Sequence, residues 1–99
     1  MAEFGIELTD DARDDLFFYS APERRQITAG IRAQLPHEPL APTKNRKLLR
    51  TNPIASWELR LGKFRVFYEV DDSSRTVKIV AVGHKVHNQL FVRGEEVKI

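Results

Sequence analysis

Residues 57–70 read WELRLGKFRVFYEV, and this stretch decides the fold. Apolar residues alternate with polar or outward-facing ones on both sides of Gly62-Lys63, which is typical of two half-buried strands. Gly62-Lys63 predicts a two-residue hairpin turn with glycine at its first central position. This turn gives the hairpin one wholly apolar face, which we expect helices to cover, made of Trp57, Leu59, Leu61, Phe64, Val66 and Tyr68.

The other face of this hairpin carries a candidate anion site. The turn sets Arg60 directly opposite Arg65, and like charges facing each other across two strands are destabilising. An anion between them would relieve the repulsion, because two guanidinium groups can fork around phosphate oxygens. Alternatively, both arginines extend into solvent, or Glu58 neutralises one of them.

A third strand follows, because Val77, Ile79 and Ala81 again alternate. A four-residue turn over residues 72–75 pairs Glu69 with Lys78, a favourable cross-strand pair. It also sets Arg65 opposite Val82, with His84 just beyond on the same face. We therefore expect the outer face to gather Arg60, Arg65 and His84, followed by Lys85 and His87. A slip of one residue would scatter this set.

Two helices precede these strands. Phe4, Ile6 and Leu8 alternate as a short strand, and Thr9 then caps the first helix. Residues 20–23 read SAPE, a capping box with proline in the first turn, and a second helix runs to about Leu35. Residues 44–50 form a short strand or an extended arm. The predicted fold class is α+β: a single domain over residues 1–99, with a small antiparallel meander sheet, an N-terminal strand and a two-helix hairpin packed on one face.

Charge is unevenly distributed along the 99 residues. Residues 1–40 hold eight acidic and four basic residues (−4), whereas residues 41–99 hold six acidic and twelve basic ones (+6). Such a local excess favours a polyanion partner, most commonly nucleic acid, although a solvated basic face without a partner is the alternative. The basic residues gather over residues 44–65: Lys44, Arg46, Lys47, Arg50, Arg60, Lys63 and Arg65.

Composition excludes several classes of protein. The absence of cysteine rules out a disulfide scaffold, a thiolate metal site and a cysteine nucleophile. No apolar run is long enough to span a membrane, and no secretory leader is visible, so we expect a cytoplasmic or nucleoid-associated protein. The spacing of His84 and His87 suits a metal pair, but no third ligand lies nearby. We therefore expect no metal and no cofactor, and a role in proton transfer for a histidine among cations.

Several short motifs in this order resemble the RelE/ParE toxin superfamily of type II toxin–antitoxin modules, with the RelE-like branch favoured. They are residues 57–60 (WELR), 64–68 (FRVFY), 82–85 (VGHK) and 90–92 (LFV), preceded by the basic segment 44–50. The resemblance implies a ribosome-dependent mRNA endonuclease (mRNA interferase), in which the ribose 2′-hydroxyl attacks the adjacent phosphate. The alternatives are a ParE-like DNA gyrase inhibitor, or a non-toxic relative that binds an antitoxin or RNA.

By position, the resemblance implies that Arg60, Arg65 and Lys85 form the catalytic basic cluster. Two positions depart from the best-known RelE pattern: Glu58 replaces a lysine, and Phe91 replaces a tyrosine that stacks on a base. Phe91 retains the stacking surface without the hydroxyl. Glu58 and His87 are then the candidate bases, and His84 and Lys85 the candidate acids. The expected RNA contacts are Lys44, Arg46, Lys47, Arg50, Lys63 and Phe91, and the expected partner is a neutralising antitoxin with acidic and apolar residues.

Overall fold

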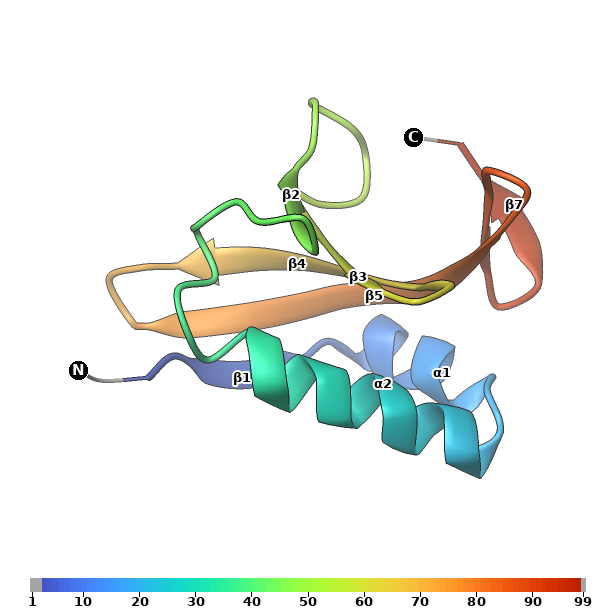
Figure 1. Ribbon diagram of the computed structural model, residues 1–99, viewed down its shortest axis with the longest axis horizontal. Helices are drawn as coiled ribbons and strands as arrows, with labels where there is room; N and C mark the ends of the chain where they lie inside the picture. The colour runs from blue at the N-terminus through green and yellow to red at the C-terminus, as the bar shows by residue number, and fades with distance from the viewer. Residues whose placement is uncertain (1–2, 99) are drawn as a thin grey trace.

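The computed structural model describes residues 3–98, and within them the chain forms two helices and seven strands (Figure 1). This architecture confirms the predicted α+β class. Along the chain the elements are β1 (Gly5–Leu8), α1 (Asp10–Phe17), α2 (Ala21–Gln34), β2 (Arg46–Leu48), β3 (Trp57–Leu61), β4 (Phe64–Asp71), β5 (Thr76–Val86), β6 (Gln89–Val92) and β7 (Glu95–Val97).

The sheet is a meander with one parallel addition. Strands β2 to β7 are neighbours in sequence order and pair antiparallel, while β1 pairs parallel with the first part of β5. Both helices lie on one face, whereas the loop after β2 and the β6–β7 hairpin rise on the other (Figure 1). We call the face turned away from the helices the outer face. No helix among the described residues is long and apolar enough to cross a membrane.

Both predicted helix starts are confirmed. The Thr9 hydroxyl accepts a hydrogen bond from the Ala12 amide at 3.1 Å, and Ser20 and Glu23 form the reciprocal capping box. The main core lies between these helices and the sheet. The predicted β3–β4 register is also confirmed, with Leu61 opposite Phe64 and the Trp57 ring stacked on Tyr68 at 6.0 Å between centroids.

The predicted register of β5 is correct over only half of the strand. Glu69 lies opposite Lys78 as expected, but a bulge inserts Val80 between the partners of Phe67 and Tyr68. Arg65 therefore faces Gly83 rather than Val82. The alternation could not reveal the bulge, because residues 80–82 read VAV and are apolar in every register.

A second apolar cluster, which the sequence analysis missed, covers part of the outer face. Phe67 is fully buried there with Ala55 and Leu90. The loop after β2 contributes Leu49 and Ile54, and the β6–β7 hairpin contributes Val92 and Val97, so these two segments form walls over the sheet. Val80 and Ala81 of β5 also pack against the cluster.

Candidate anion-binding site on the outer sheet face

A row of cationic residues crosses the outer face beside the second apolar cluster. Arg60 of β3 lies opposite Arg65 of β4, which confirms the predicted like-charge pair. Arg65 in turn pairs with Gly83 of β5, and Lys85 is two residues further along, on the same face. Arg60 is exposed and Lys85 half-buried. The row therefore holds three positive side chains from three adjacent strands.

Arg65 is held rigidly within this row. Its side chain is buried, and its Nη1 donates to the carbonyl oxygens of Gly62 at 2.7 Å and Phe64 at 2.9 Å. Its Nε is buried and has no hydrogen-bond partner among the described residues. Burial, and to a lesser extent the nearby Arg60 charge, lowers the pKa of Arg65, while Glu58 opposes this shift. The guanidinium thus keeps one donor without a protein partner, in a row of cations whose combined charge attracts an anion.

Glu58 lies on the same face, two residues before Arg60 on β3. It is buried, and it lies opposite Lys47 on one side and Phe67 on the other. Arg65 is the diagonal neighbour of Glu58 across β3 and β4. The predicted neutralisation of an arginine by Glu58 is consistent with this placement, and the carboxylate lies close to the cationic row.

The predicted position of His84 on the outer face is wrong. The bulge sets His84 opposite Phe64, so it faces the helices. There its Nδ1 lies 2.7 Å from the Tyr19 hydroxyl. Burial, followed by the Lys63 ammonium, lowers the pKa of His84, and burial raises the pKa of Tyr19 to about 12. A neutral imidazole accepting the phenol proton fits both directions.

Phe91 is also turned away from the row, and His87 lies in the turn that follows β5. Phe91 pairs with His84 across β5 and β6, and the two rings stack at 5.7 Å. His87 is exposed at the first position of the β5–β6 turn, where its φ is +50°. Among the described residues, no three histidine, cysteine, aspartate or glutamate side chains gather in a way that could hold a metal.

Arg46, expected to bind RNA, is a structural residue instead. It lies opposite Leu59, whose side chain belongs to the main core, so its side chain points to the helix side of the sheet. Its guanidinium is buried and donates to three carbonyl oxygens at the end of α2 and in the loop that follows, those of Gln34 (2.9 Å), His37 (3.1 Å) and Ala41 (3.1 Å). A cation suits this position because helix carbonyls near the C-terminus lack partners.

The remaining predicted RNA contacts are exposed. Lys44 and Arg50 flank β2, and Lys47 lies within it. Lys63 lies in the β3–β4 turn, and its Nζ is 3.4 Å from the Glu23 carboxylate of α2. Exposed lysines and arginines around β2 thus extend the cationic row toward the edge of the sheet.

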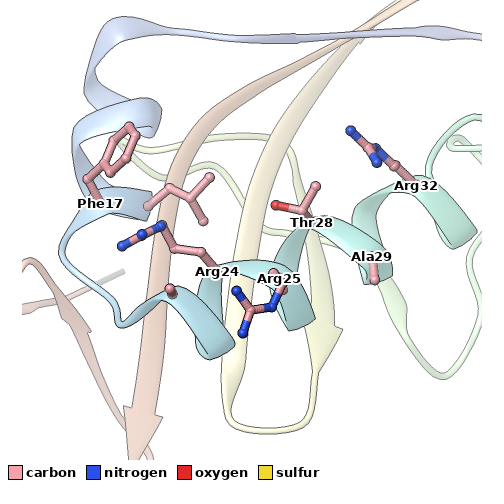
Figure 2. A pocket seen from close by; sticks show the side chains of 8 residues that line it. Phe17, Arg24, Arg25, Thr28, Ala29 and Arg32 are labelled. Carbon is pink, nitrogen blue, oxygen red and sulfur yellow. The ribbon is translucent and has the colours of Figure 1, made fainter.

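A groove runs along the helix layer, on the opposite side of the molecule (Figure 2). Its volume is about 490 Å³, and apolar side chains of Leu16, Phe17 and Ala29 line it. Phe17 is 64% exposed, so a large apolar side chain is open to solvent at this groove. Three arginines also line the groove: Arg24, Arg25 and Arg32.

Comparison with known proteins places the chain in a family. Residues 6–88 match the sequence model of the ParE toxin of the type II toxin–antitoxin system parDE. The chain belongs to this family. It is a type II toxin of the RelE/ParE superfamily, as the resemblance implied. No curated protein sequence matches this toxin.

Two solved structures share the toxin's fold. One is the RelBE2 toxin–antitoxin complex of Mycobacterium tuberculosis, with 28% identity and a TM-score of 0.75 over 86% of this chain and 94% of the other. The second is the archaeal RelE–RelB complex of Pyrococcus horikoshii, with 20% identity and a TM-score of 0.67 over 86% of this chain and 98% of the other. Their likeness to this chain extends over nearly the whole of each of those chains.

Proposed function

We propose that this toxin is a ribosome-dependent mRNA endonuclease that works without a metal ion and binds RNA with its outer face. The observation that carries the proposal is the row of Arg60, Arg65 and Lys85, in which Arg65 keeps an unpaired buried Nε. The M. tuberculosis RelBE2 complex, similar at 28% identity, supports the RelE-like branch.

The proposed reaction is an intramolecular phosphoryl transfer within one strand of RNA. The ribose 2′-oxygen forms a bond to the adjacent phosphorus, the bond to the 5′-oxygen breaks, and a 2′,3′-cyclic phosphate and a 5′-hydroxyl result. The crowded phosphorane carries extra negative charge, which preorganised guanidinium groups stabilise. Glu58 is the candidate acceptor of the 2′-hydroxyl proton and Lys85 the candidate donor to the leaving oxygen. We exclude His84 as the general acid, because its side chain faces the helices.

The test is to map RNA ends after incubating the toxin with ribosomes programmed with a defined mRNA. We expect new 5′-hydroxyl ends at discrete positions. Arg60→Ala should slow cleavage by ~10²–10³, as expected for loss of one donor to the developing charge. Arg25→Ala also removes an exposed charge, but from the helix layer, and this variant should cleave normally. Intact mRNA after incubation with wild-type toxin would refute the proposal.

A second candidate function is inhibition of DNA gyrase. The family model is that of a ParE toxin, and Phe91 has no hydroxyl and stacks on His84 rather than lying over the cationic row. Loss of supercoiling by purified gyrase in the presence of the toxin, together with intact mRNA, would favour this function.

We also propose a neutralising antitoxin as partner, with acidic and apolar residues that bind the helix-layer groove. The apolar lining with Phe17 and the rim of three arginines have the complementary chemistry. Both similar structures are toxin–antitoxin complexes. Phe17→Glu should prevent co-purification of the antitoxin from the native host. Ser73→Glu, in the β4–β5 turn, should retain it.

A further inference from the structure

Asp15 is a buried carboxylate in the last turn of α1. Its side chain is only 3% exposed, although the surrounding residues Asp11 and Asp14 are open to solvent. Its Oδ2 accepts a hydrogen bond from the Val82 amide at 3.0 Å. Its Oδ1 lies 2.8 Å from Nε of Arg93. A single carboxylate therefore joins α1 to β5 and to the turn between β6 and β7.

Arg93 attaches the tip of the β6–β7 hairpin to α1. Besides Asp15, its guanidinium lies 4.0 Å from Asp11 and 3.9 Å from Asp14. A side-chain Cβ added at Gly94, the next residue in the turn, would lie 3.5 Å from the Phe18 ring, so the turn passes close to the C-cap of α1. The tip of the hairpin is thus held to the helix by charge.

The root of this hairpin lies beside the cationic row. Only three described residue pairs join β5 to β6, and one of them places Leu90 opposite Lys85. Leu90 also packs on Phe67 in the second apolar cluster. A hairpin with so short a ladder depends on its other attachment for a fixed position.

We propose that Asp15 and Arg93 are a positioning pair, which fixes the β6–β7 hairpin and, through Leu90, the place of Lys85 in the outer-face row. The effect on Lys85 rests on the proposed RNA cleavage, whereas the effect on the hairpin does not. The pair orients a wall of the site and has no direct contact with substrate.

The energetics indicate that this pair contributes to the position of the β6–β7 hairpin rather than to the overall stability of the fold. Buried ion pairs often add little stability, because desolvation offsets the attraction. Here burial raises the pKa of Asp15, despite the opposing Val82 hydrogen bond and Arg93 charge. The stability linked to this titration is full below the unfolded pKa and is lost as the pH rises through the folded one. Burial therefore offsets part of the attraction between Asp15 and Arg93.

Hydrogen exchange of the whole toxin tests the proposal directly. Asp15→Asn retains an acceptor for the Val82 amide but removes the charge, and Arg93→Gln removes the other partner. We expect amides of residues 89–98 to exchange at least ~10-fold faster in both variants, while those of β3 and β4 stay unchanged. The melting temperature of Asp15→Asn should be equal to or above that of the wild type. Arg93→Lys should restore much of the protection.

Arg13→Gln is the matched control, because it breaks an exposed ion pair on the same helix. In the cleavage assay, Asp15→Asn and Arg93→Gln should each lower kcat by ~10-fold with little change in KM, since the proposed RNA contacts around β2 remain. Unchanged exchange over residues 89–98, or equal acceleration throughout the sheet, would overturn the proposal. A wild-type toxin that fails to cleave would refute the proposed function alone, because the exchange result needs no substrate.

Discussion

Replacing Arg46 with methionine tests whether this buried arginine holds the fold together. Methionine fills the space of the aliphatic stem but cannot donate to the three carbonyls of Gln34, His37 and Ala41. A hydrogen bond from a charged donor contributes roughly 1.5–3 kcal/mol. These three residues are half-buried or exposed, so water can replace part of the loss. We therefore expect a net cost of about 2–4 kcal/mol.

That cost is a large part of the ~5–15 kcal/mol stability of a domain of this size. The melting temperature should fall by about 10–25 °C, and urea denaturation followed by circular dichroism measures the free energy directly. Lys44→Met removes an exposed charge just before β2 and should change stability by less than ~0.5 kcal/mol. An Arg46→Met toxin with wild-type stability but weakened RNA binding would refute the reasoning.

Three further substitutions probe the core, the site and the buried histidine. Trp57→Ala should cost ~3–5 kcal/mol in the urea titration, because it empties a ring site stacked on Tyr68; an unchanged midpoint would contradict the assigned register. Arg65→Ala should abolish cleavage and also lower stability by ~1–3 kcal/mol, whereas a purely external residue would affect cleavage alone. Because burial and Lys63 lower the pKa of His84, its contribution to stability is full above the unfolded pKa of about 6.5 and is lost as the pH falls below it. His84→Gln should therefore reduce the drop in melting temperature between about pH 7.5 and pH 5.5, and an equal drop in both proteins would exclude His84 as its source.

Local pattern predicted the fold well where one face of each element is apolar and the other polar. Both helix caps and the β3–β4 turn followed from residue types that satisfy specific backbone groups. The bulge at Val80 left no such trace, because its neighbours are apolar too. That one inserted residue moved His84 from the outer face to the helix side.

The burial of individual arginines also could not be predicted from the sequence. Arg46 and Arg60 look alike in a basic segment, but one is buried against carbonyl oxygens and the other is exposed. The pairing of the strands separates them, since Arg46 lies opposite Leu59 on the helix side and Arg60 lies opposite Arg65 on the outer face. The adjacent Leu48 and Leu49 leave the face of Arg46 undefined in the sequence. The sequence did not indicate that Asp15 is buried, because a carboxylate between the apolar residues of a helix is expected to face solvent. Its partners Val82 and Arg93 are remote in sequence, so local spacing could not reveal them.

The pairing of β1 with β5 has a consequence for how the toxin is made. Thr9, which follows β1, lies 71 positions before Val80 in the sequence, and its hydroxyl is 3.5 Å from the Val80 carbonyl oxygen. Contacts of such long range slow folding, because a large loop must close before they form. During synthesis, β1 has no strand to join until residues 76–79 have left the ribosome. Strand β1 therefore stays unpaired until this part of β5 is available, and products of translation that stop before Lys85 lack the complete outer-face row.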